Sequence, residues 1–229
     1  PILEMGAEYR RLLGYLPQDF GFYENFTAIR FMKYMAALKG LPKEYADTRI
    51  DELLNLVDLD SVKNSKLRTY SGGMIRRIGI AQALLNEPEI LILDEPTAGL
   101  DPKERVRFRN IISTQRKNRT VLLSTHIVSD IEYIADNILI MKQGELITNG
   151  TESQITENVN GHVWKCMVTE QEMQSLNEEY IVSNLKNCKE MIELRIVSEK
   201  KPIEDAIPVQ ATLEDAYLYH TQKYGGQNN

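Results

Sequence analysis

The chain has 229 residues, of which 42% are hydrophobic and 26% are charged. This composition fits a soluble globular protein with one large domain, or one domain with an appendage. Acidic residues outnumber basic ones by 33 to 27, which gives a formal net charge of −6. We therefore expect no nucleic-acid partner, because such a partner would need a basic face. No apolar run approaches the roughly 20 residues of a membrane-spanning helix.

The first part of the chain predicts one strand followed by helices. Residues 12–16 form a short apolar run, and Gln18 follows in a polar turn. Thr27 can cap a helix, and a second amphipathic helix begins near Glu44. Two helices in succession without a strand between them predict a helical subdomain over about residues 27–86.

Strands and helices alternate from Ser71 onward. A helix that opens at Ser71 precedes an apolar strand at 90–93, and Asp101 caps the next helix. A second apolar strand covers 121–125, and residues 138–148 form a hairpin around a Gln-Gly turn. This alternation predicts the α/β class, with a parallel sheet covered on both faces by helices.

The alternation of apolar strands with amphipathic helices ends at about residue 150. Residues 162–168 and 191–197 have the pattern of strands, residues 170–179 that of a helix, and residues 212–222 that of a capped terminal helix. The sequence therefore predicts a small α+β appendage over residues 151–229.

Polar side chains follow the apolar strands at the edge where a doubly wound sheet binds its ligands. Asp94 can hold Mg²⁺ through a water, and Glu95 can orient or deprotonate a water that attacks a phosphate. His126 can donate a hydrogen bond to a γ-phosphate, and Gln18 can reach the metal or the water. The alternative is structural: two acids that end a strand, a histidine at a helix start and a glutamine on the surface.

A second set of residues can bind an anion at a helix start. The backbone N–H groups of Ser71, Gly72 and Gly73 would face outward at the positive end of a helix dipole. The alternative is an ordinary serine N-cap followed by flexible glycines. Arg76 and Arg77 follow on the same helix, and we expect both to lie on the solvated surface.

The order of these motifs resembles that of the ATP-binding subunit of an ABC transporter over residues 12–150. The segment YLPQD resembles the Q-loop, YSGGM a variant of the LSGGQ signature, and ILILDEP the Walker B strand. The segment AGLD resembles the D-loop, and STH the loop of the switch histidine. Tyr70 and Met74 replace the commoner Leu and Gln of the signature, which leaves the contact of that Gln open.

The resemblance implies ATP and Mg²⁺ as ligands and assigns roles to four residues. Glu95 would be the general base or water-positioning residue, and Asp94 would hold Mg²⁺ through water. Gln18 would complete the metal site and sense the partner, and His126 would contact the γ-phosphate.

The resemblance also implies a second ATPase subunit, identical or different. Ser71, Gly72 and Gly73 would bind the nucleotide held by that subunit, and Asp101 would lie near the interface.

The implied architecture is a P-loop NTPase-like ABC ATPase domain, truncated at its N-terminus, over residues 1–150. Its helical subdomain would span about residues 27–86, and the accessory α+β region residues 151–229. The implied partner is an integral-membrane permease of an exporter, docked on the aromatic segment 20–38. The subunit would then be cytoplasmic and peripheral to the inner face of the cell membrane.

The 229 residues contain no G-x-x-x-x-G-K-S/T, the Walker A loop that cradles the β and γ phosphates. Two explanations are open: a fragment of a full ATPase subunit, or a degenerate subunit that lends its signature to a partner. The retained Glu95, His126 and Gln18 favour the fragment. We expect the chain by itself to bind ATP poorly and to hydrolyse it negligibly.

Two other functions remain open. One is a soluble ABC-type ATPase that acts on DNA or ribosomes, although the chain shows neither a long coiled coil nor a second ATPase unit. The other is a non-catalytic partner subunit, which describes the chain if nothing supplies the missing loop.

Overall fold

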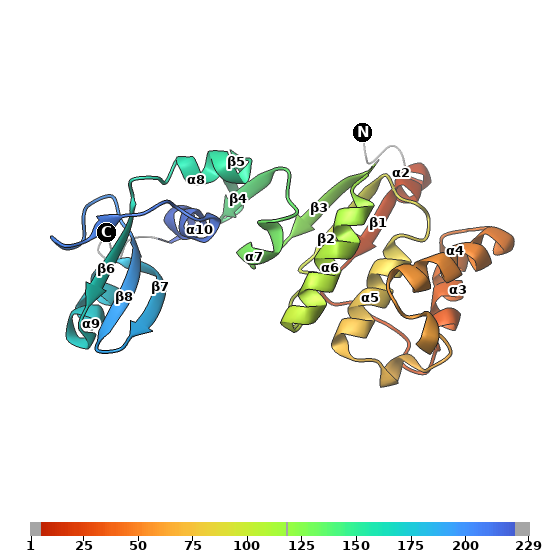
Figure 1. The fold of residues 1–229 in the computed structure, drawn as a ribbon. Helices are drawn as coiled ribbons and strands as arrows, with labels where there is room; N and C mark the ends of the chain where they lie inside the picture. Colours follow the sequence, from red (N-terminus) through yellow and green to blue (C-terminus); the bar gives the residue numbers. More distant parts are fainter. Residues whose placement is uncertain (1–5, 118, 223–229) are drawn as a thin grey trace. The chain divides into compact units, whose positions relative to one another are not determined.

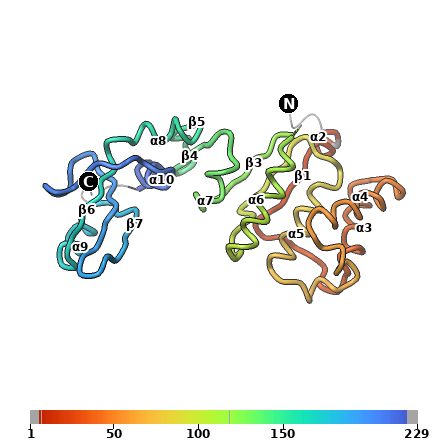
Figure 2. Tube along the Cα trace, in the orientation of Figure 1, coloured from red at the N-terminus to blue at the C-terminus, as the bar shows by residue number. Residues whose placement is uncertain are grey.

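The computed structural model describes residues 6–117 and 119–222. The chain divides into two compact units after Asp130, and each unit is described by itself. Figure 1 labels the elements, and Figure 2 traces the same chain as a tube from the red N-terminal part to the blue C-terminal part.

Three parallel strands form the sheet of the first unit, in the order β1-β2-β3 (Figure 1). Their bounds are β1 (Leu13–Leu16), β2 (Ile90–Asp94) and β3 (Thr120–Ser124). In register, Leu16 lies beside Leu93, and Asp94 beside Ser124. The parallel sheet and the α/β class predicted from the sequence are confirmed.

Helices make up the rest of the first unit. Their bounds are α2 (Ala7–Leu12), α3 (Ala28–Leu38), α4 (Lys43–Leu56), α5 (Gly72–Ala83), α6 (Pro102–Gln115) and α7 (Val128–Ile131), with 3₁₀ turns η1 (Asp60–Val62) and η2 (Leu67–Thr69). Three of them begin at capping side chains: Thr27, Ser71 and Asp101 each accept a bond from a backbone N–H one turn later. All of the regular structure between β1 and β2 is helical, which confirms the helical subdomain, while its exact bounds stay a prediction.

Strand β1 and helix α5 approach each other closely at Gly14. A Cβ at this position would lie 2.3 Å from the carbonyl oxygen of Ala83, so no larger residue fits. The same face of the sheet carries the fully buried Leu16, Leu91 and Leu93.

The opposite face of the sheet is more open than the sequence predicts. Tyr15, Ile92 and Leu122 share one row across the three strands. Tyr15 is 46% exposed and Leu122 52% exposed. Within the described residues, one face is therefore buried and the other only partly covered.

The second unit combines a hairpin with a four-stranded antiparallel sheet in the order β7-β8-β6-β9. The elements are β4 (Ile138–Lys142), β5 (Glu145–Gly150), α8 (Glu152–Glu157), β6 (Val163–Val168), α9 (Glu170–Glu179), β7 (Ile181–Cys188), β8 (Met191–Val197), β9 (Ile207–Pro208) and α10 (Leu213–Thr221). The hairpin packs against α8 and α10. The predicted domain boundary after residue 150 stays a prediction.

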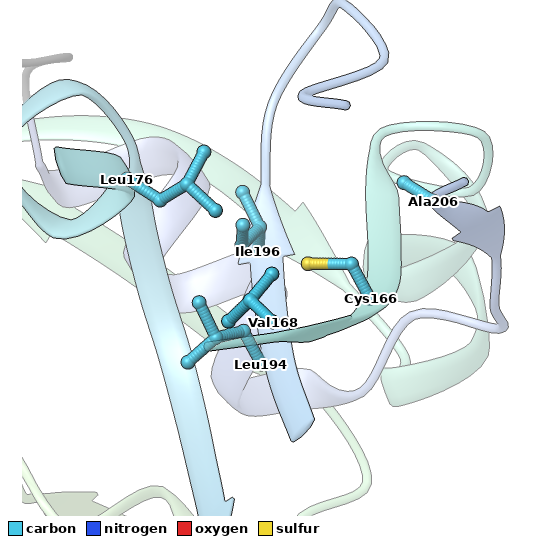
Figure 3. Close-up of a cluster of buried hydrophobic side chains, with 6 residues drawn as sticks. All are labelled: Cys166, Val168, Leu176, Leu194, Ile196 and Ala206. Carbon is cyan, nitrogen blue, oxygen red and sulfur yellow. The ribbon is translucent and has the colours of Figure 1, made fainter. Parts of the chain in front are cut away.

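A small apolar core holds the antiparallel sheet together (Figure 3). Side chains from β6, β8 and α9 meet there with that of Ala206: Cys166, Val168, Leu176, Leu194, Ile196 and Ala206. Elsewhere in this unit, the side chain of Arg195 on β8 pairs with Asp215 on α10 at 2.7 Å. Burial alone would raise the pKa of Asp215, but hydrogen bonds from Arg195, Ser183 and Thr212 outweigh it and hold the pKa below its usual value.

The sequence did not predict strand β7. Only Ile181 of this strand is buried, and the polar segment Asn184–Asn187 lies exposed at the sheet edge. A strand of this kind lacks the apolar alternation that marks a half-buried strand.

None of the helices in the described parts of the chain is both long enough and apolar enough to cross a membrane.

Candidate functional site

The parallel register of the first sheet brings the predicted catalytic residues to one edge. Strand β2 ends at Asp94 and continues into Glu95, whose backbone N–H donates to the Ser124 carbonyl at 3.0 Å. Strand β3 ends at Ser124, two residues before His126. The carboxyl ends of both strands therefore present their polar residues together, as predicted.

The carboxylate of Asp94 is fixed by its neighbour on β3. Ser124 Oγ donates to Asp94 Oδ1 at 2.5 Å, at the short end of the range for a hydroxyl bonded to a carboxylate. Oδ2, the second oxygen of Asp94, is not engaged by Ser124. Ser124 is not among the site residues predicted from the sequence, although its place at the end of an apolar strand, two residues before His126, is a usable signal.

Glu95 and His126 form a two-point contact. Glu95 Oε1 accepts from the backbone N–H of His126 at 3.0 Å and lies 2.8 Å from its ring Nδ1. An ionised carboxylate only accepts, so an ionised Glu95 requires the proton of this contact to be on Nδ1. Glu95 Oε2 is buried and has no hydrogen-bond partner within the described ranges.

The backbone of Glu95 adopts the left-handed conformation, with a φ of 42°. This conformation costs a non-glycine residue on the order of 1 kcal/mol and occurs often at functional sites. The turn is closed by the N–H of Ala98, which donates to the Glu95 carbonyl at 3.3 Å. The turn thus directs the Glu95 side chain toward β3 and His126.

Gln18 lies at the same edge of the sheet, two residues beyond the end of β1. Because Leu16 is level with Leu93, Gln18 follows β1 as Glu95 follows β2. Its side chain is exposed, and no hydrogen bond joins it to Asp94 or Glu95 within the described residues. The structure therefore places Gln18 at the edge without tying it to the acids.

The starts of helices α5 and α6 lie side by side and contain the other predicted site residues. Ser71 Oγ accepts from the N–H of Met74 at 3.2 Å, and Asp101 Oδ1 from that of Glu104 at 2.9 Å. A Cβ on Gly73 would lie 2.8 Å from the Glu104 side chain, so the two helices meet there. Two positive helix ends adjoin, with Gly72 and Gly73 in the first turn of α5.

Arg77 corrects a prediction from the sequence, because it does not lie on the solvated surface. It is only 8% exposed, and its Nε lies 3.1 Å from Glu104. Its Nη1 donates to the carbonyl oxygens of Val57 and Asp58. A guanidinium with several geometrically fixed donors can be buried when carbonyl and carboxylate acceptors surround it. Arg77 thereby links α5 to α6 and to the end of α4.

Two buried residues close in sequence to Glu95 and His126 were not predicted from the sequence as part of the site. Thr97, two residues after Glu95, donates from Oγ1 to Asp130 Oδ2, and both side chains are buried. Asp130 stands four residues after His126, a spacing that places an acid one turn along from the switch loop.

The donor set at the strand ends fits a hydrated magnesium ion better than a metal held by the protein alone. Among the described residues no group of three or more His, Cys, Asp or Glu side chains is arranged to hold a metal. Magnesium in phosphate-transfer sites takes one or two carboxylates and fills its remaining positions with water and phosphate oxygens. Asp94, whose Oδ2 is not engaged by Ser124, meets that requirement.

Comparison with known proteins identifies the family. Residues 4–98 match the model of the ABC transporter family. The chain is 38% identical over 174 residues to the uncharacterized ABC transporter ATP-binding protein YxlF of Bacillus subtilis (strain 168), covering 76% of this chain and 59% of that protein. It is 32% identical to the linearmycin resistance ATP-binding protein LnrL of the same organism, covering 77% of this chain and 56% of that protein.

A solved structure agrees with this assignment. The structure of an ATP-binding subunit of an ABC transporter matches with a TM-score of 0.60 and 30% identity, over 69% of this chain and 66% of that one. The chain therefore belongs to the ABC transporter family and shares the fold of its ATP-binding subunits. It spans only 44–59% of the first three curated relatives that it matches.

The capping role of Asp101 predicts a measurable effect on stability. Asp101→Ala removes the acceptor for the Glu104 N–H and should lower the free energy of unfolding by about 1 kcal/mol. Asp101→Asn keeps a side-chain oxygen of the same reach and should stay within about 0.5 kcal/mol of the wild type. Urea denaturation followed by circular dichroism measures both, and equal losses in the two variants would contradict a capping role.

Proposed function

We propose that this chain is the ATP-hydrolysing subunit of an ABC transporter and that Glu95 and His126 form its catalytic pair. The observation that carries the proposal is their two-point contact at the end of two parallel strands. The left-handed backbone of Glu95 supports the proposal. Strained backbone conformations of this kind cluster at active sites, where they hold a side chain in the position that the reaction requires.

In this mechanism Glu95 positions the attacking water. Its Oε1 is engaged by His126, which leaves the buried Oε2 as the acceptor for a water proton. A general base has to lie within hydrogen-bond reach of the proton it takes, and a fixed carboxylate meets that condition. The loss of such a base usually costs a factor of about 10²–10⁴ in rate.

His126 orients Glu95 and faces the phosphate with its other ring nitrogen. Nδ1–H donates to Glu95, so Nε2 can donate to a γ-phosphate oxygen only when the ring carries both protons. A doubly protonated ring would then bridge two anions, the carboxylate and the phosphate. The His126 side chain is 68% exposed, which leaves Nε2 accessible to a ligand.

Asp94 and Gln18 would hold the hydrated metal. Ser124 fixes one carboxylate oxygen of Asp94, so the group keeps one orientation. When bound, Mg²⁺ would neutralise charge on the β and γ phosphates. Gln18, exposed at the same edge, would complete its coordination through an amide oxygen.

The second cluster, at the starts of α5 and α6, would serve a nucleotide held by a second ATPase subunit. Ser71, Gly72 and Gly73 present backbone N–H groups at the positive end of α5, and Asp101 begins the neighbouring helix. The second subunit would be a copy of this chain or a different ATPase subunit, since the same surface suits both arrangements.

The phosphate cradle has to be supplied by residues beyond this sequence, whichever polypeptide carries them. The 229 residues contain no G-x-x-x-x-G-K-S/T, and that loop provides both positioning and charge stabilisation. The chain by itself is therefore proposed to bind ATP weakly and to hydrolyse it negligibly.

A pocket of the first unit is the proposed docking site for an integral-membrane permease. It has a volume of about 940 Å³ and lies between β1, the turn after it, α3 and α5. Phe20, Phe31, Met35 and Leu38 supply apolar lining, which suits an apolar helix of a partner. This arrangement would keep the subunit at the cytoplasmic face of the membrane.

The charges around the pocket favour an acidic residue on the docked segment. Its described lining includes three cations, Arg10, Arg11 and Lys39, and no Asp or Glu. Burial lowers the pKa of Lys39, whose ammonium donates to Asn86 Oδ1 at 2.7 Å. A carboxylate on the docked segment would pair with the partly desolvated ammonium of Lys39. The pocket would thus attract an acidic segment although the chain as a whole is acidic.

The direction of transport is proposed to be export. One relative, LnrL, carries a name that refers to linearmycin resistance. Removal of a toxic compound is one way in which a transporter confers resistance, and we extend that direction to this chain.

The role of Glu95 predicts a loss of turnover with binding retained. The chain is joined to an N-terminal segment that carries a G-x-x-x-x-G-K-S/T loop, and the unextended chain serves as the inactive reference. Glu95→Gln should lower kcat by at least about 10² while ATP still binds, because the amide cannot take a proton. Glu89→Gln, an exposed change just before β2, is the control and should leave kcat unchanged. Unaltered turnover in the Glu95 variant would contradict the proposed mechanism.

Docking in the pocket predicts a selective release from membranes. Leu38→Glu places a charge on the apolar lining of the pocket and should lower the membrane-bound fraction of the chain about tenfold in cells that contain the permease. Leu56→Glu on α4 is the matched control, since Leu56 is also exposed but does not line the pocket. Sedimentation of membranes measures both variants. Equal retention or equal release of the two would contradict docking at this pocket.

A further inference from the structure

A buried hydrogen bond joins the two segments that carry Glu95 and His126. Thr97 Oγ1, two residues after Glu95, donates to Asp130 Oδ2, four residues after His126. Thr97 is fully buried and Asp130 is 1% exposed, so water does not compete for this bond. The bond thus links the same two segments as the Glu95–His126 contact, but within the protein interior.

The Thr97–Asp130 pair is an unusual element of a core. Asp130 Oδ1 is buried and has no hydrogen-bond partner in the described parts of the chain. A buried carboxylate with one hydroxyl partner is less favourable than two apolar side chains of the same shape. A contribution to the free energy of unfolding therefore does not account for the pair. The relevant feature is that the bond connects the segment of Glu95 with the segment of His126.

The Glu95–His126 contact needs support of this kind. The His126 side chain is 68% exposed, and the segment around it contains only the single turn α7 (Val128–Ile131). An exposed side chain on a short loop loses conformational freedom when it is held in one position. A fixed point on each segment reduces that loss, because it keeps the segments at the spacing that the contact requires.

We propose that Thr97 and Asp130 are positioning residues that hold the switch loop against the turn of Glu95, so that His126 reaches Glu95 Oε1. The catalytic consequence rests on the function proposed above, whereas the positional effect does not. Without the buried bond, the loop from Thr125 to Asp130 would move away from the turn, and His126 would lose both bonds to Glu95.

The test is hydrogen exchange of the His126 backbone N–H, measured by NMR in the full chain without nucleotide. This N–H donates to Glu95 Oε1, so its exchange rate reports the contact directly. Thr97→Val keeps the shape of the side chain and deletes the hydroxyl, and it should speed this exchange about tenfold. Thr97→Ser keeps the hydroxyl and should remain within about threefold of the wild type.

The exchange of the Leu93 backbone N–H, in strand β2, separates a positional effect from a general loss of stability. The proposal expects the His126 rate to rise more than the Leu93 rate in Thr97→Val. Equal His126 rates in Thr97→Val and Thr97→Ser, or a rise confined to Leu93, would overturn it.

A second variant keeps the test valid if Thr97→Val does not fold, since that substitution leaves the buried Asp130 carboxylate without a hydrogen-bond partner. The double variant Thr97→Val/Asp130→Leu removes both polar groups, and such paired replacements are often close to neutral for stability. It should fold and still show the faster His126 exchange. Wild-type exchange in this variant would overturn the proposal. Because no nucleotide is present, neither result depends on whether the chain hydrolyses ATP.

Discussion

The in-register pairing of β2 with its two parallel neighbours is the constraint on which the candidate site depends. It sets Leu93 beside Leu16 and Asp94 beside Ser124, so that three strands end at one level. The close approach of α5 at Gly14 fixes the register of β1, since a shift by one residue would bring Leu13 or Tyr15 to a position that has no room for a side chain. The polar residues that follow the strands are brought together as a consequence.

Local contacts then convert this shared edge into a specific arrangement. The left-handed turn at Glu95 directs its carboxylate toward β3, and the short bond from Ser124 orients Asp94. Glu95 Oε2 keeps no hydrogen-bond partner within the described residues, and the exposed ring of His126 remains accessible to a ligand. In the proposed mechanism these features give each acid a separate task, Asp94 toward a metal and Glu95 toward a water.

The sequence predicts the parts of the fold and site that depend on strong local patterns. The apolar run Ile90–Leu93, the caps Thr27, Ser71 and Asp101, and the acids after β2 all carry such patterns. Strand β7 could not be predicted in this way, because an edge strand with exposed polar residues has no apolar alternation.

Other features were missed because they depend on tertiary contacts. Arg77 is buried by acceptors just after α4 and on α6 that are distant in the sequence. The partner of Asp130 is Thr97, thirty-three positions away, and no local spacing connects them. The left-handed φ of Glu95 follows from the turn as a whole, because glutamate has no preference for that conformation.

The protonation of the His126 ring tests the central claim most directly. An ionised Glu95 can only accept a proton, so the account predicts that neutral His126 carries its hydrogen on Nδ1, the nitrogen 2.8 Å from Glu95 Oε1. The ¹⁵N chemical shifts of the two ring nitrogens, measured on the neutral ring, distinguish the tautomers, and Glu95→Gln is the reference. The account predicts the Nδ1–H form in the wild type. A ring that carries its hydrogen on Nε2 in both proteins would contradict the Glu95–His126 pair and the function built on it.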